Sequence, residues 1–285
     1  MTTVFRSSLL AFLTVPVLAS AAPAPERARL LEEAMANAVP PGGYHSRVVL
    51  ADSIVKLVQE GVLDPRKFEA VYAQRGGIPA GLKEVLDRPS RQPILLTRET
   101  ANVHVTLLWP LGLANRMAAN SESPLNGPGR DRFASTAGWR LGTRANGGVY
   151  FNKFPIVELT AAQEALVTRV ARGTFRPCCD NSTFFQDCNH GSALLGLLAL
   201  GATQGLTEDE LYREALAFNA FWFPHNYAHT ALYFKAVRST QWRDVDPREV
   251  MSANFSSASG WRANVAGELQ RRGLVPEQGG ADCDV

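Results

Sequence analysis

The chain has 285 residues, of which 46% are hydrophobic and 20% are charged, and its formal net charge is +2. This composition predicts a globular protein with a sizeable hydrophobic core. The near-neutral charge argues against a nucleic-acid-binding protein, because such proteins carry a basic surface. Four cysteines are too few for the disulfide scaffold of a small secreted domain.

Residues 1–21 have the pattern of a secretory signal peptide. Arg6 supplies a positive charge, residues 9–18 are apolar, and the small residues Ala19 and Ala21 mark a cleavage site. The apolar run is about half the ~20 residues that a membrane-spanning helix needs. We therefore expect an exported protein, periplasmic or extracellular, with no stable membrane span.

The segment after the signal peptide predicts an N-terminal helical subdomain over residues 22–92. The first helix is expected to begin near Pro25 and to end before the Pro-Pro-Gly-Gly run at residues 40–43. Residues 46–60 carry apolar side chains near a 3.6-residue period, which predicts a second helix. Short helices are expected after Asp64 and after Pro79. The main helical domain then covers residues 93–285.

The middle of the chain is harder to interpret. Residues 97–117 favour one helix, although Val103 and Val105 would suit a strand and Pro110 would break or kink a helix. His104, between the two valines, is expected to be a core histidine. Residues 119–155 are rich in Asn, Ser, Gly and Pro. They predict a long irregular insert or a β-hairpin around residues 146–148.

Helix signals return in the last half of the chain. Thr160 with Gln163 and Thr207 with Glu210 have the spacing of capping boxes, in which the two side chains satisfy free N–H groups at a helix start. Further helices are expected over 190–203, 225–238 and 247–272. We therefore predict a mainly α-helical fold, a single multi-helix domain with the insert at about 119–155.

Three of the four cysteines cluster before an apolar helix. Cys178, Cys179 and Cys188 lie within eleven residues, whereas Cys283 is near the end of the chain. Residues 193–200 are apolar on nearly every side, so the helix is expected to be buried. Its N-terminus would favour a thiolate at Cys188, since the free N–H groups there attract negative charge. Arg176 could add a positive charge or could lie in an exposed turn.

Our main interpretation is a transition-metal site. Cys178, Cys179, Cys188 and His190 form a Cys₃His set, of the kind that binds zinc or copper, although two adjacent cysteines can share one ion only through an unusual turn. Two weaker candidate ligands, His225 and His229, are four residues apart on one predicted helix face. The expected partner is a metal ion or a small molecule. The aromatic residues at 218–227 could form core or an apolar wall for such a ligand.

A structural alternative is that the cysteines form disulfides. Cys178 or Cys179 could bond to Cys188 and close a loop of about ten residues, and the remaining cysteine could then pair with Cys283. Disulfides are the common fate of cysteines in exported proteins. In that case the protein would be a non-catalytic structural or interaction protein.

A third interpretation is catalytic. The run Gln186-Asp187-Cys188 before an apolar helix resembles the nucleophile segment of papain-like and bacteriocin-processing cysteine peptidases, over some twenty residues. The resemblance implies a cysteine-dependent hydrolase with Cys188 as nucleophile and with His225 or His229 as base. Asn189 stands where those families carry glycine, and their base histidine lies much further downstream on a strand.

Overall fold

The computed structural model describes residues 23–137 and 139–275. The predicted signal peptide and Cys283 lie outside these residues. Within the described ranges, no helix is both long enough and apolar enough to cross a membrane.

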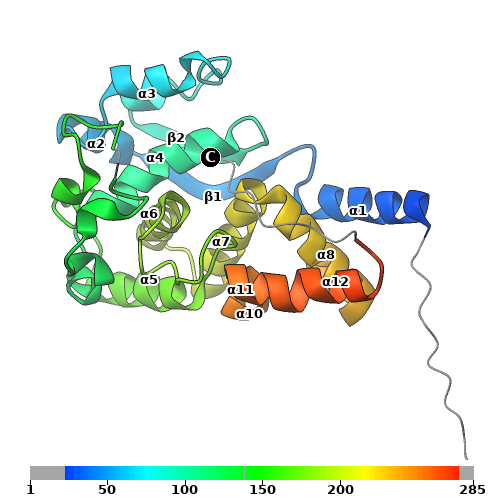
Figure 1. Cartoon of the computed structure of the whole chain (residues 1–285). Coiled ribbons are helices and arrows are strands. Elements are labelled where there is room, and N and C mark those ends of the chain that lie inside the picture. Colours follow the sequence, from blue (N-terminus) through cyan, green and yellow to red (C-terminus); the bar gives the residue numbers. More distant parts are fainter. Residues whose placement is uncertain (1–22, 138, 276–285) are drawn as a thin grey trace, which may run out of the picture.

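Two buried helices form the centre of the molecule (Figure 1). Helix α4 (Ala101–Ala114) packs against α6 (Asn189–Thr203), and nearly every side chain of both is buried. A Cβ atom at Gly112 would lie 1.8 Å from the carbonyl oxygen of Ser192, and one at Gly196 would lie 2.7 Å from that of Leu108. The two backbones are therefore in direct contact. Helix α4 continues through Pro110, so the strand alternative for this segment is wrong.

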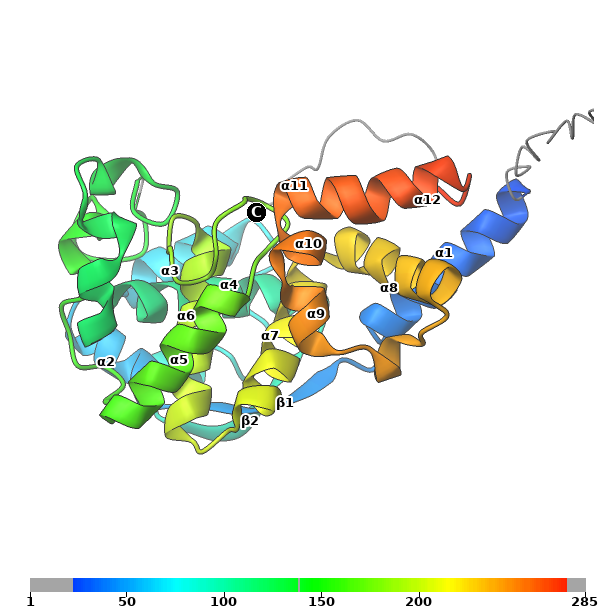
Figure 2. The same cartoon turned by 90° about the horizontal axis from the view of Figure 1, so that it is seen from below.

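Helices α5 (Ala161–Gly173) and α7 (Glu208–Trp222) flank α6, as Figure 2 shows. Both predicted capping boxes are present, with Thr160 and Thr207 accepting hydrogen bonds from the N–H groups of Gln163 and Glu210. These caps fix the starts of both helices and confirm that part of the sequence analysis.

The predicted helix over residues 46–60 is wrong in its first half. Residues Tyr44–Ala51 form strand β1, which pairs antiparallel with β2 (Ser90–Leu96), and only Ser53–Gln59 form a helix, α2. Alternate side chains of β1, at Ser46, Val48 and Leu50, are buried. This period of two, together with the β-branched pair at 48–49, favours a strand once a partner strand is available. The remaining N-terminal elements are α1 (Ala24–Ala38), α3 (Pro65–Ala73) and the 3₁₀ turn η1 (Glu84–Leu86).

The C-terminal part consists of one long helix and several short ones. The long helix α8 (Pro224–Arg238) is covered by the segments that follow it (Figure 2). The predicted continuous helix over 247–272 is wrong, because Ser252 and Ser257 adopt extended backbone conformations and interrupt it. The segments are η6 (Trp242–Asp244), α9 (Pro247–Met251), α10 (Ala253–Ser256), α11 (Ala258–Gly260), the π-helical turn η7 (Trp261–Ala266) and α12 (Gly267–Arg271).

The insert at 119–155 is irregular, as one of the two sequence alternatives predicted. It contains short 3₁₀ turns, and residues 146–148 lead into one of them in place of a β-hairpin. The turns are η2 (Ala118–Glu122), η3 (Pro124–Asn126), η4 (Arg130–Arg132) and η5 (Gly147–Tyr150). The mainly α-helical fold class with a single domain is confirmed.

Candidate functional site

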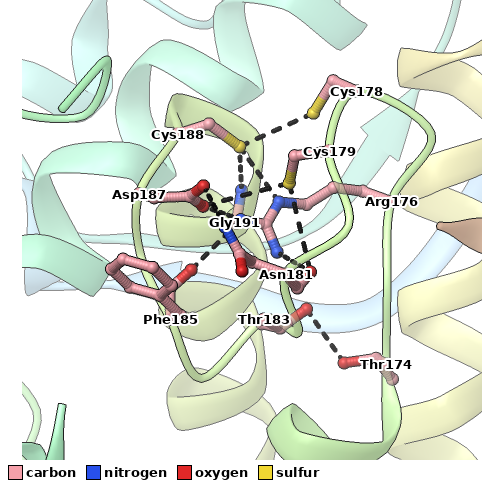
Figure 3. A network of polar contacts seen from close by, with 10 residues as sticks. All are labelled: Thr174, Arg176, Cys178, Cys179, Asn181, Thr183, Phe185, Asp187, Cys188 and Gly191. Carbon is pink, nitrogen blue, oxygen red and sulfur yellow. Dashed lines mark hydrogen bonds and ion pairs between the residues drawn. The ribbon is translucent and has the colours of Figure 1, made fainter. Parts of the chain in front are cut away.

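The cysteine loop, residues 174–188, connects α5 to α6 and is closed at its base by two threonines (Figure 3). The Thr174 hydroxyl donates to the Thr183 hydroxyl at 2.9 Å, and the Thr183 N–H donates to the Thr174 carbonyl oxygen at 2.9 Å. Both threonines are fully buried. The first part of the loop, residues 174–183, is therefore closed by a fixed contact, and residues 184–188 lead on to α6.

Neighbouring segments also bind the cysteine loop. The N–H groups of Ala258 and Ser259, in α11, donate to the Cys179 carbonyl oxygen at 3.0 Å and to the Asp180 carboxylate at 2.7 Å. On the other side, the Ser135 N–H donates to the Asp187 carbonyl oxygen at 3.2 Å. The C-terminal helices and the irregular insert thus position the loop together.

Arg176 lies inside the loop with its side chain fully buried. Its Nε donates to the Cys188 sulfur at 3.0 Å, and its two terminal nitrogens donate to the carbonyl oxygens of Asn181 at 2.9 Å and Phe185 at 3.1 Å. It also forms an ion pair with Asp187, whose carboxylate accepts a further bond from the Asn181 amide at 2.7 Å. Of the two sequence alternatives for Arg176, the structure selects the positive charge beside the cysteines.

Cys188 is the N-cap residue of α6. Its sulfur accepts a hydrogen bond from the Gly191 N–H at 3.4 Å, so the free N–H groups of the helix face it. A Cβ atom at position 191 would lie 2.5 Å from the central carbon of the Arg176 guanidinium. Gly191 therefore leaves the space that the buried arginine occupies.

The three cysteine sulfurs gather in one place. All lie within 4.8 Å of one another, and those of Cys178 and Cys188 are 3.6 Å apart. Figure 3 shows the Cys178 sulfur directed toward that of Cys188, whereas the sulfur of the adjacent Cys179 points toward Asn181 and Asp187. The three are free thiols in this structure, and the predicted disulfides stay a prediction.

The sulfur atoms differ in acidity. Hydrogen bonds from the thiols of Cys178 and Cys179, followed by the charge of Arg176, hold the pKa of Cys188 well below its usual value although burial opposes this. Hydrogen bonding to Cys179 and Cys188, with burial, raises the pKa of Cys178. The pKa of Cys179 rises to about 12; its contact with Cys178 lowers it, but the contact with Cys188 and burial outweigh that. Of the three, Cys188 is therefore the thiol that loses its proton most easily.

The candidate histidines occupy different positions. His190 is on the first turn of α6, where its ring packs on Phe223 at 4.5 Å between ring centroids. His190 also contributes to the lowered pKa of Cys188. On α8, His225 is exposed, whereas His229 is buried and stacks on Trp261 at 5.9 Å. The close group of ligand atoms in the described residues consists of the three cysteines, so metal ligation by any of these histidines stays a prediction.

The structure contains part of the arrangement that the catalytic interpretation requires. Cys188 lies at a helix N-terminus with a lowered pKa, as a nucleophile would. Within the described part of the chain, however, neither His225 nor His229 forms a hydrogen bond to Cys188. The base that the peptidase resemblance implies is therefore not paired with the sulfur.

The sequence analysis missed two residues of the site. Asp187 and Asn181 complete the polar contacts of Arg176; Asn181 was not named, and Asp187 was named only as part of the run before Cys188. The available signal was an acidic residue directly before Cys188 in a loop that also contains one arginine. The aromatic residues at 218–227 are buried or partly buried, as expected of core, and His104 is buried as predicted.

Comparison of the chain with protein-family models, with curated proteins and with solved structures found no match.

Proposed function

We propose that this protein binds a soft transition-metal ion, zinc or copper, through the thiolates of Cys178, Cys179 and Cys188. The observation that carries the proposal is the approach of three sulfur atoms to within 4.8 Å of one another. Zinc and Cu(I) bind well to thiolates, whereas hard cations such as magnesium and calcium prefer oxygen ligands.

The spacing of the sulfurs suits a shared ion. Two sulfurs bound to one tetrahedral zinc, each with a bond of about 2.3 Å, lie about 3.8 Å apart. The Cys178 and Cys188 sulfurs are already 3.6 Å apart. The Cys179 sulfur lies within 4.8 Å of the other two, so it would have to approach them by up to about 1 Å.

The charges around the cluster also support the proposal. Three thiolates with a divalent ion carry an excess negative charge, and burying such a charge is costly unless it is paired. Arg176 supplies a fixed positive charge 3.0 Å from one sulfur, and the N-terminus of α6 adds favourable N–H groups. The protein thus provides a counter-ion for the metal–thiolate group.

The two metals differ in whether they need a fourth ligand. Zinc commonly takes four ligands in structural sites, and His190, two residues after Cys188, is our candidate for the fourth position. Cu(I) is satisfied by the three sulfurs. Loss of zinc binding but not of copper binding in His190→Ala would support this assignment.

We further propose that the protein is exported, periplasmic or extracellular. The proposal is supported by the positive charge, the apolar run and the small residues of positions 1–21. Mass spectrometry of the N-terminus of protein recovered from the periplasm or the medium, with cleavage after Ala21, would test it. Recovery of only uncleaved chains from the cytoplasm would contradict it.

The metal proposal is tested on the reduced chain by elemental analysis after incubation with zinc or with Cu(I) and removal of excess ion. We expect one ion per chain, and loss of stoichiometric binding in Cys178→Ser, Cys179→Ser and Cys188→Ser. His45→Ala is the matched control and should keep full binding, since His45 is exposed on β1 and is not a candidate ligand. Absence of both metals from the folded, reduced wild-type chain would overturn the proposal.

A further inference from the structure

The sulfurs of Cys178 and Cys188 face each other at 3.6 Å without being bonded. A disulfide bond is about 2.05 Å long, so the two atoms would have to approach by about 1.5 Å. Cys178 lies in the part of the loop that the two threonines close, whereas Cys188 is the N-cap residue of α6. Joining the pair therefore calls for a movement of the Cys178 side of the loop toward the fixed start of α6.

The two sulfurs have different surroundings. The Cys188 sulfur accepts hydrogen bonds from Arg176 Nε at 3.0 Å and from the Gly191 N–H at 3.4 Å. These donors stabilise an electron-rich, nucleophilic sulfur. Cys178 lies opposite with neither donor, in the position of a thiol that would react second. Cys179 is directed instead toward the Asn181 carbonyl oxygen and the Asp187 carboxylate, at 4.0 and 3.9 Å.

We propose that, in the metal-free protein, Cys188 and Cys178 form a redox-active pair that reduces hydrogen peroxide. The Cys188 thiolate attacks one peroxide oxygen, the O–O bond breaks, and Cys188 sulfenic acid and hydroxide form. The thiol of Cys178 then attacks the Cys188 sulfur, the S–O bond breaks, and a Cys178–Cys188 disulfide and water form. Two electrons pass from the two sulfurs to the peroxide, which is the oxidant.

Arg176 has a defined part in the first step. Its guanidinium is held by the Asn181 and Phe185 carbonyl oxygens and faces the reacting sulfur. A fixed positive charge there stabilises the negative charge that develops on the departing hydroxide oxygen. All three cysteine residues are partly exposed, so the cluster lies near the protein surface, where a small oxidant such as hydrogen peroxide can approach it.

The inference rests on the proposed function only in that peroxide and metal would compete for the same sulfurs. Oxidation of the pair removes two of the three proposed ligands, so the disulfide form would release the ion. Conversely, a bound ion would shield Cys188 from peroxide. Metal content and redox state of this loop would therefore control each other.

The test treats reduced, metal-free full-length protein with one equivalent of hydrogen peroxide, then alkylates and digests it for mass spectrometry. We expect loss of two free thiols per chain and a peptide pair joined through Cys178 and Cys188. In Cys178→Ser, dimedone should trap a sulfenic acid at Cys188. Cys188→Ser should lose the rapid consumption of peroxide.

Cys179→Ser separates the two proposals. It removes a metal ligand but leaves the reacting pair, so it should form the disulfide while it fails to bind zinc. A wild-type chain that forms the disulfide but binds no metal would contradict only the metal proposal. Peroxide consumption by Cys188→Ser at the wild-type rate, or a disulfide between a different pair, would overturn the redox proposal.

Discussion

Helix α6 connects two regions that are stabilised in different ways. Along its length it packs on α4 so closely that the glycines at 112 and 196 leave no space for a side chain. At its N-terminus it meets the cysteine loop, where a fully buried arginine bonds to a sulfur, two carbonyl oxygens and a carboxylate. The contact between α4 and α6 is stabilised by close packing, whereas the cysteine loop is stabilised by a buried charge and its hydrogen bonds. Helix α6 can therefore hold the cysteine loop in a fixed position, because the rigidity of the helix comes from its packing against α4.

The largest expected effect comes from removing the charge in the loop. Arg176→Met leaves the Asp187 carboxylate and the Cys188 sulfur without their buried partner, and we expect the free energy of unfolding to fall by about 3–5 kcal/mol. Urea denaturation of the reduced protein measures this change. Arg29→Met, which removes an exposed ion pair on α1, is the control and should be almost neutral. An equally small effect at Arg176 would mean that charge does not stabilise the loop.

In the helix contact, a single methyl group should be the most damaging addition. Gly112→Ala places a Cβ atom 1.8 Å from a backbone oxygen of α6, so the helices must separate. We expect a loss of about 3 kcal/mol of unfolding free energy. Gly42→Ala, where no atom lies within 4 Å of the added carbon, serves as the control. Unchanged stability of Gly112→Ala in urea would show that the contact is adjustable.

The stability of the region around α4 should also depend on pH. Burial lowers the pKa of His104, on α4, to about 4. Between that value and its usual value of about 6.5 the unfolded chain binds a proton that the folded chain does not, so stability falls as pH falls. We expect this residue to make the wild type about 2 kcal/mol less stable at about pH 5 than at about pH 7.5. The unfolding free energy of His104→Leu should change less between these two pH values than that of the wild type. An equal change in both proteins, measured by urea denaturation, would contradict the assignment to His104.

The smallest expected effect lies where the two regions meet. Gly191→Ala puts a Cβ atom 2.5 Å from the Arg176 guanidinium, whose burial limits its movement. We expect a loss of about 1–2 kcal/mol in stability and, if the metal proposal holds, about tenfold weaker metal binding. Competition with a chromogenic chelator measures the second effect. Normal metal affinity would show that the guanidinium position is not critical.

Local signals predicted much of the fold. The capping boxes at Thr160 and Thr207 identified two helix starts correctly, since a cap depends on residues three apart in the chain. Strand β1 was missed because its valines fit both periods, and the choice depends on pairing with β2 some forty residues later. The π-helical turn and the breaks at Ser252 and Ser257 could not be predicted from the local sequence pattern either.

The site was predicted in composition but not in its contacts. Three cysteines in eleven residues indicated a cluster, and the structure brings their sulfurs together. The sequence could not show whether Arg176 faces solvent or the sulfurs, because this depends on hydrogen bonds from segments distant in the chain. Nor could it place His229, whose stacking on Trp261 is set by the packing of the C-terminal helices.

The buried guanidinium of Arg176 has a consequence for how the loop would change when an ion enters or leaves. Many small metal-binding domains unfold without their metal. Once the metal–ligand bonds are lost, nothing holds the ligand side chains together, and charged ligands repel one another. Here a permanent cation already occupies the centre of the loop, and its partners are carbonyl oxygens that no metal needs. The loop is therefore already ordered, and little of its conformational entropy would be lost when a metal ion binds. If the proposed ion binds, we therefore expect the backbone of the loop to have the same conformation with and without it.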